Sequence, residues 1–314
     1  MNLQGKGKSA ARHLKRMKNY SYAKLKSDFS YQSHYKKIKR DIETRAKDEN
    51  TKTAIVVHLF YPEAWEQISK RIKLIRKFQY DVFVSLPPDK IDFGNKIISD
   101  FPGAYIYESP NQGRDVLPFM AIAASLSSAG YRYVLKIHSK KSTHRKDGQD
   151  WFTEIINNLI PSNDKVQQSI VELLHQSKTS IIGPAKNYTS LVVNFEANGE
   201  HMTEVVKKIY GKNTARTVLQ TNRKEYGFFA GTMLWVKLDS IEPLLKIGKV
   251  GRFEAEKGQI DATYAHALER LLCVVPEIEK QRIYEVDNNG VREIGYSDGI
   301  IPDWSEVYIG PKPE

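Results

Sequence analysis

The first strongly apolar stretch of the chain covers residues 54–60, which are mostly β-branched and aliphatic. A continuous apolar run of this kind is typical of a parallel strand covered on both faces. Apolar residues then recur at three- and four-residue spacing from Trp65 to Ile75, which predicts a helix over residues 63–78. A second strand is predicted at residues 81–86, where two prolines end it. Strand, helix and strand in this order predict a βαβ unit.

The alternation of strands and helices continues toward the C-terminus. Further strands are predicted at residues 104–108, 133–138, 179–184 and 227–236. Further helices are predicted at residues 92–101, 117–127, 151–159, 164–175 and 259–272. The pattern predicts an α/β, Rossmann-like, mostly parallel sheet with helices on both faces, whose ligands bind beyond the carboxyl ends of the strands.

Three parts of the chain differ in character. Residues 1–50 form a basic arm with helical propensity and few apolar anchors, so we expect a loosely docked helical segment. Residues 51–285 form the α/β domain. Residues 286–314 are polar with several Gly and Pro, which predicts a loosely structured tail.

The positive charge of the chain is concentrated in the arm. Residues 1–50 hold 14 Lys and Arg against five Asp and Glu, so +9 of the net charge of +11 lies there. Such an arm attracts an anionic membrane, a nucleic acid or an acidic partner. The alternative is a solvated leader that only improves solubility. A nucleic-acid partner is not expected, because the rest of the chain shows no nucleic-acid-binding motif.

The sequence predicts a cytoplasmic protein. Its single cysteine, Cys273, lies in an apolar run and is expected to be buried. The longest nearly apolar stretch, residues 116–126, is too short to span a bilayer, and the N-terminus has no apolar signal core. A location at the inner face of the plasma membrane, through the arm, is compatible with these features.

Two familiar site types are excluded. Gly7-Lys8-Ser9 matches the end of a phosphate-binding loop, but the earlier glycine of that motif falls on Asn2 and no strand precedes it. The eight histidines lack metal-ligand spacing and there is no cysteine cluster, so a zinc site is not expected.

Polar residues gather at the end of the first strand and before the predicted helix 117–127. His58, Phe60 and Tyr61 could hold a base or a ribose, although a strand-end histidine can also be purely structural. In the segment Asn111-Gln112-Gly113-Arg114-Asp115, the arginine could bind phosphate at a helix N-terminus. The alternative role of Asp115 is to cap that helix.

A third polar segment follows the predicted strand 133–138. His138, Ser139, Lys140 and Lys141 place three potential cations at one sheet edge, where they could neutralise a diphosphate leaving group. An exposed basic loop is the alternative.

A fourth group combines residues 227–235 with residues 259–270. Asp261, near the start of the predicted helix, could be a general base for an acceptor hydroxyl or a partner of the helix dipole.

Taken together, these segments resemble the rhamnan synthesis protein F family of bacterial polysaccharide assembly. The matching stretches are residues 58–61, 111–116, 135–142, 227–235 and 261–270. The resemblance extends from about residue 53 to residue 285 and leaves the arm and the tail outside. That family is similar to glycosyltransferases with the A-type fold, which commonly bind a divalent metal through an Asp-x-Asp motif. Here the corresponding positions are His138-Ser139-Lys140, so we expect no metal and a direct role for side-chain cations.

The resemblance implies a nucleotide-sugar donor such as dTDP-rhamnose and a glycan or lipid-linked glycan acceptor. Asp261, His138 and Lys140 would be catalytic. Residues expected to bind the donor are His58, Phe60, Tyr61, Asn111, Gly113, Arg114, Asp115, Ser139 and Lys141. Gly231, Thr232 and Trp235 would contact the acceptor. A non-catalytic glycan-binding or assembly protein on the same fold is the alternative.

Overall fold

The computed structural model describes residues 36–44, 53–139, 148–193, 195–247, 253–259 and 261–295. The strands are β1 (Thr53–His58), β2 (Tyr80–Leu86), β3 (Tyr105–Glu108), β4 (Tyr133–His138), β5 (Thr179–Pro184), β6 (Tyr188–Ser190), β7 (Gly227–Phe229), β8 (Leu234–Lys237), β9 (Arg282–Val286) and β10 (Val291–Glu293). The helices are α2 (Trp65–Ile72), α3 (Gly94–Asp100), α4 (Val116–Ser128), α5 (Gly148–Leu159), α6 (Asp164–His175), α7 (Phe195–Arg216), α8 (Glu242–Ile247) and α9 (Tyr264–Ile278). A further helix covers residues 36–44.

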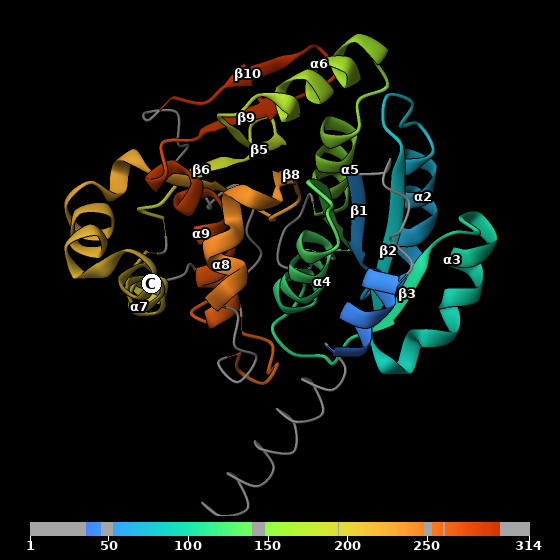
Figure 1. The fold of residues 1–314 in the computed structure, drawn as a ribbon, viewed down its shortest axis with the longest axis horizontal. Coiled ribbons are helices and arrows are strands. Elements are labelled where there is room, and N and C mark those ends of the chain that lie inside the picture. Colours follow the sequence, from blue (N-terminus) through green and yellow to red (C-terminus); the bar gives the residue numbers. More distant parts are fainter. Residues whose placement is uncertain are drawn as a thin grey trace, which may run out of the picture.

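An eight-stranded, mainly parallel sheet forms the centre of the molecule, in the order β10-β9-β5-β8-β4-β1-β2-β3 (Figure 1). β4, β1, β2 and β3 are parallel neighbours, while β8 runs antiparallel between β4 and β5. The chain therefore passes from β1 outward to β3 and then returns to the other side of β1 as β4. The carboxyl ends of β1 and β4 flank this reversal, which is the usual ligand-binding position in an open α/β sheet.

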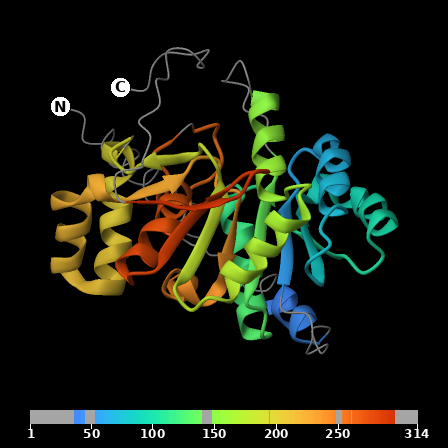
Figure 2. The ribbon, with the colours of Figure 1, turned by 90° about the horizontal axis from the view of Figure 1, so that it is seen from above.

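Helices cover both faces of the sheet, and the strands alternate between the two cores (Figure 2). In β4, Val134 packs with α4, α7 and α9, whereas Leu135 and Ile137 pack with α2, α5 and α6. In β1 and β2, neighbouring residues likewise belong to opposite cores, because successive side chains of a strand point to opposite faces. The observed architecture confirms the predicted Rossmann-like α/β fold.

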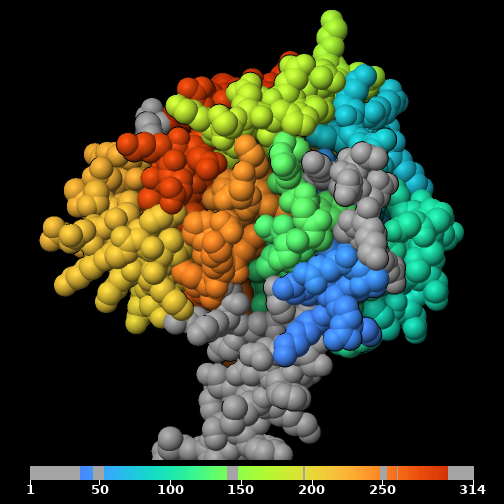
Figure 3. All heavy atoms as spheres, viewed as in Figure 1, coloured from blue at the N-terminus to red at the C-terminus, as the bar shows by residue number. Residues whose placement is uncertain are grey.

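Parts of the arm and of the tail are more ordered than the sequence suggests. In the helix at residues 36–44, Ile38 and Ile42 are buried in the core beside α4, and the Tyr107 hydroxyl donates to Asp41 at 3.0 Å. Figure 3 shows this helix lying against the body of the protein. It is firmly docked, because its apolar residues share one face. At the other end, β10 pairs with β9 inside the segment expected to be loose.

The helix predicted at residues 63–78 is shorter and ends at Ile72. Two further predicted elements differ in ways that affect the site. The strand expected at residues 227–236 is divided into β7, which pairs with β6, and β8 of the main sheet. Gly231 and Thr232 turn the chain between them with φ values of 86° and 51°. The helix expected at residues 259–272 begins at Tyr264, with Thr263 as its N-cap, so Asp261 precedes the helix. Among the described residues, no helix is long and apolar enough to cross a membrane.

Candidate functional site

Four polar side chains lie on one face of the sheet near its carboxyl edge. His58 and His138 are the last residues of β1 and β4 and are paired in register. Lys136 lies two residues before His138, and Ser85 of β2 is paired with His58. Because side chains alternate along a strand, all four face α4 and α9. All four are buried, with exposed fractions of 1–7%.

Asp115 at the start of α4 completes this buried cluster. Its Oδ2 is ion-paired with the Lys136 ammonium and lies 3.8 Å from Nε2 of His138. Nδ1 of His58 is 2.9 Å from the Ser85 hydroxyl. Asp115 is the N-cap residue of α4, but its side chain makes no capping hydrogen bond and points to the sheet. The carboxylate is therefore used to join α4 to β4.

Charge and burial set the protonation of this cluster. Burial alone would raise the pKa of Asp115, but the nearby His138 and Lys136 outweigh it and hold that pKa far below its usual range. For His58, burial is the largest effect and lowers the pKa to about 4, with Asp115 opposing the shift. At neutral pH the Asp115 carboxylate is charged and His58 is neutral.

The Gly231-Thr232 turn lies against the same cluster. The Gly231 carbonyl is 2.7 Å from Nε2 of His138, and the Thr232 carbonyl accepts from Lys136 at 2.7 Å. The Thr232 hydroxyl bonds to Glu269 of α9. Gly231 and Thr232 both adopt left-handed backbone angles, which a non-glycine residue such as Thr232 adopts only when surrounding contacts impose them. The structure thus brings the turn to the predicted site.

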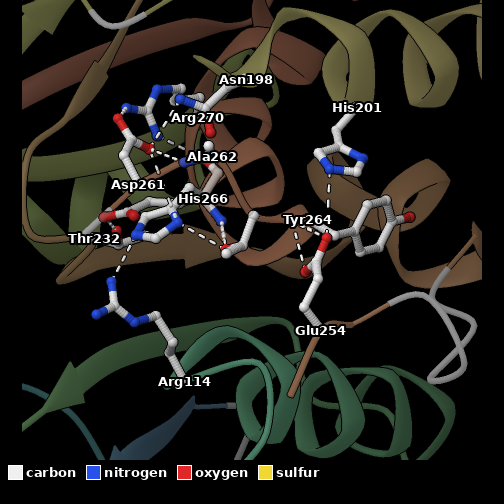
Figure 4. A network of polar contacts seen from close by, with 12 residues as sticks. Arg114, Asn198, His201, Thr232, Glu254, Asp261, Ala262, Tyr264, His266 and Arg270 are labelled. Carbon is white, nitrogen blue, oxygen red and sulfur yellow. Dashed lines mark hydrogen bonds and ion pairs between the residues drawn. The ribbon is translucent and has the colours of Figure 1, made fainter. Parts of the chain in front are cut away.

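Arg114 extends from the turn before α4 to α9, as Figure 4 shows. Its Nη1 is 2.6 Å from Nε2 of His266, and its Nε is 3.9 Å from Glu256. Its side chain is 39% exposed, so this cation reaches solvent beside the buried cluster. Gly113 and Arg114 both have positive φ, of 64° and 56°. That backbone turn directs Arg114 away from its own helix.

Asp261 lies on the other side of His266. Its Oδ1 accepts from Asn198 and from the Ala262 backbone, both at 2.9 Å, and is 3.8 Å from Nδ1 of His266. Its Oδ2 pairs with Arg270 at 3.1 Å (Figure 4). The carboxylate is 19% exposed. It is placed near Arg114, and its role as a general base stays a prediction.

The segment after β1 is tied to the end of β4. The Tyr61 backbone N–H donates to the Ser139 hydroxyl at 2.8 Å. Lys90 donates to the Phe60 carbonyl at 2.6 Å, and its ammonium is 4.2 Å from the centre of the Phe60 ring. Phe60 and Tyr61 form an edge-to-face pair that is partly exposed. They lie at the carboxyl edge, as predicted, with Lys90 beside them.

Other predicted residues are not joined to this group. Trp235 is 1% exposed, stacks on Phe78 and donates to the Leu159 carbonyl at 2.9 Å, so the structure places it in the core rather than at an acceptor surface. It faces the core because it lies on β8, next to β4 and β5. Asn111 is exposed on the turn before α4. Lys140 and Lys141 lie outside the described residues.

Sequence reasoning missed Lys136, His266 and Lys90. Lys136 carried a signal, since a lysine between apolar neighbours on a central strand needs a buried partner. His266 lies three residues after the Thr263 cap, where a histidine in a helical segment carries no signal of its own. Lys90 follows a pair of prolines, and only the fold shows that it meets Phe60.

The described residues at this edge do not fit a divalent metal. Mg²⁺ and Mn²⁺ prefer several oxygen ligands, whereas Asp115 is already paired with Lys136 and the adjacent strand ends supply imidazoles and a hydroxyl. In the described part of the chain, no group of three or more His, Cys, Asp or Glu could hold a metal ion. Metal-independent chemistry stays a prediction.

Comparison with known proteins gives two findings. The sequence model of the family described as rhamnan synthesis protein F matches residues 12–280, so the similarity includes most of the basic arm, which was expected to lie outside it. Two curated proteins, each named uncharacterized protein WxcX, from Xanthomonas campestris pv. campestris strains B100 and ATCC 33913, are 33% and 32% identical over 184 residues. The match covers 56% of this chain and 24% of each relative.

Proposed function

Because the chain belongs to the rhamnan synthesis protein F family, we propose that it is a glycosyltransferase acting in the synthesis of a bacterial cell-surface polysaccharide. Its donor is a nucleotide sugar, with dTDP-rhamnose as the first candidate, and its acceptor is the glycan or a lipid-linked precursor.

The observation that carries this proposal is the location of the polar group. His58 and His138 end the two strands that flank the reversal of the sheet, and Arg114 stands beside them at the entrance to α4. In open α/β sheets, nucleotides bind at this position, with phosphates near a helix N-terminus. A partly exposed arginine there suits a diphosphate, because its planar group forms paired charge-assisted hydrogen bonds.

The proposed reaction is a direct displacement. Asp261 takes the proton of an acceptor hydroxyl, and the acceptor oxygen forms a bond to the anomeric carbon of the donor sugar. The bond from that carbon to the diphosphate oxygen breaks, and the nucleoside diphosphate leaves with the electron pair. Arg114, and Lys140 from the sequence prediction, stabilise its charge. Asp261 and Arg114 lie on opposite sides of the same imidazole, which suits these two roles.

A donor panel tests this proposal. Purified protein is incubated with UDP-, GDP- and dTDP-sugars and a glycan acceptor, in EDTA or with Mn²⁺, and release of the nucleoside diphosphate is measured. We expect turnover of one donor in EDTA. Turnover that EDTA abolishes and Mn²⁺ restores would contradict metal independence. Absence of turnover and of nucleotide binding with every donor would contradict the transferase proposal.

One observation favours a non-catalytic assembly protein instead. Both carboxylate oxygens of Asp261 already accept hydrogen bonds, from Asn198 and Arg270 among others, which suits a structural anchor. Glycan binding without any donor hydrolysis or transfer would support this second candidate.

A further inference from the structure

The contact between Arg114 and His266 defines the state of the imidazole. A guanidinium only donates hydrogen bonds, so Nε2 of His266, 2.6 Å from Nη1 of Arg114, must be the acceptor. The ring proton then lies on Nδ1, which is 2.7 Å from the Thr263 hydroxyl. Both ring nitrogens are satisfied only by the neutral, Nδ1-protonated tautomer, with Thr263 accepting.

The surroundings of His266 favour the neutral form. The side chain is 6% exposed on the first turn of α9. Burial is the largest effect and lowers its pKa to about 4; Asp261 and Asp115 oppose this shift, and Arg114 and Arg270 add to it. An imidazolium here would face two guanidinium groups, and it would have no lone pair to offer Arg114.

Arg114 needs such a partner to be ordered. Its side chain is 39% exposed, and its Nε is 3.9 Å from Glu256, a long contact. A long, partly exposed side chain loses rotamer freedom when it binds a ligand, and a fixed acceptor reduces that loss beforehand. His266 itself is fixed by burial and by Thr263, whose hydroxyl also caps α9.

We propose that His266 is a positioning residue which, as a neutral imidazole protonated on Nδ1, holds the Arg114 guanidinium in the orientation that receives the donor diphosphate. This inference rests on the proposed function for its ligand. His266 acts through Arg114 and does not contact the sugar.

Nitrogen NMR of the ¹⁵N-histidine-labelled full chain tests the tautomer without any ligand. We expect His266 to be neutral and protonated on Nδ1 at pH 7. In Arg114→Ala, Nε2 loses its partner, and we expect its resonance to shift. An imidazolium, or a proton on Nε2 in the unaltered protein, would overturn the proposal.

Variants test the positioning. With the tightest-binding of dTDP, UDP and GDP as probe, calorimetry should show about a tenfold or greater loss of affinity for Arg114→Ala, since charge-assisted hydrogen bonds are lost. His266→Leu, which removes the acceptor, should show a similar loss. His266→Gln keeps an acceptor and should recover most of the affinity. Thermal unfolding identifies any variant that does not fold.

The double variant Arg114→Ala/His266→Leu separates positioning from an independent role. If His266 acts through Arg114, the double variant should bind no more weakly than Arg114→Ala. Additive losses would overturn the proposal. If no nucleoside diphosphate binds the unaltered protein, the proposed function and the ligand of Arg114 both fail. The NMR result then still decides whether His266 holds Arg114.

Discussion

Lys136 and Asp115 are the residues on which the site depends most strongly. Lys136 is fully buried and the side chain of Asp115 is 17% exposed, and each charge is acceptable there because the other neutralises it. Lys136 also donates to the Thr232 carbonyl, so one ammonium joins β4, the start of α4 and the 231–232 turn. Its position on the sheet resembles that of a bound cation, since it contacts oxygen atoms from two other segments, the start of α4 and the 231–232 turn.

Replacement of Lys136 by Met should destabilise the protein by about 3–5 kcal/mol, because Asp115 is left buried without its partner. The free energy of unfolding is measured in urea at pH 7. Lys136→Met/Asp115→Asn should recover part of the loss, since no charge then remains unpaired. A loss below about 1 kcal/mol in the single variant would show that the pair is not structurally important.

Two buried histidines make stability depend on pH. The pKa of His58 and that of His266 are both lowered from 6.5 to about 4, mainly by burial. Between these values the unfolded chain takes up protons that the folded chain does not. Stability is therefore complete above pH 6.5 and decreases as the pH falls toward 4.

From pH 6.5 to pH 5 we expect a loss of about 1.5 kcal/mol per histidine, measured by urea unfolding. His58→Gln should remove about half of this dependence. His175→Gln, at an exposed position of α6, is the matched control and should leave it unchanged. Equal stability of the unaltered protein at both pH values would contradict the assignment of neutral, buried histidines.

At the scale of elements, the turns before α4 and before α9 place the functional side chains. Arg114, Thr232 and Ala262 all have positive φ without being glycine, and all three lie beside the site. Such angles are unfavourable for residues with a Cβ and persist where packing imposes them. Position 113 requires glycine, because a Cβ there would lie 2.5 Å from the Phe253 ring and 2.7 Å from Cβ of Leu117.

Gly113→Ala should cost about 1–3 kcal/mol of stability, since it adds both a strained backbone angle and a steric clash. It should also weaken nucleotide binding, because Arg114 is the next residue. Urea unfolding and calorimetry measure the two effects. Gly103→Ala, where a Cβ meets nothing within 4 Å, is the control. Equal effects of the two substitutions would show that the turn is not constrained.

Many elements of the α/β domain were predictable, but α7, α8 and β9 were not predicted, and neither were the contacts between elements. Continuous apolar runs located β1, β2 and β4, because strands buried on both faces leave few polar positions. The division between β7 and β8 was missed, since it depends on the left-handed angles at Gly231 and Thr232.

The candidate site was predicted in part. Strand ends indicated His58 and His138, whereas the contact of Arg114 with His266 joins residues 152 positions apart.

At the scale of the whole molecule, the sheet order brings segments from most of the domain to one edge. β1, β4, the start of α4 and the start of α9 meet there, and the helix at residues 36–44 packs beside α4. The matched segment makes up 24% of the length of the WxcX proteins.

Calorimetric binding of dTDP-rhamnose and dTDP to the full chain in EDTA, with Arg114→Ala and Arg292→Ala compared, tests the proposed diphosphate site most directly. Arg292 is an exposed arginine on β10, far along the sheet order from β1 and β4. We predict binding without metal that weakens about tenfold or more in Arg114→Ala and is unchanged in Arg292→Ala. Unaltered binding in Arg114→Ala, or loss of binding in both variants alike, would contradict a diphosphate site at the junction of β1, β4 and α4.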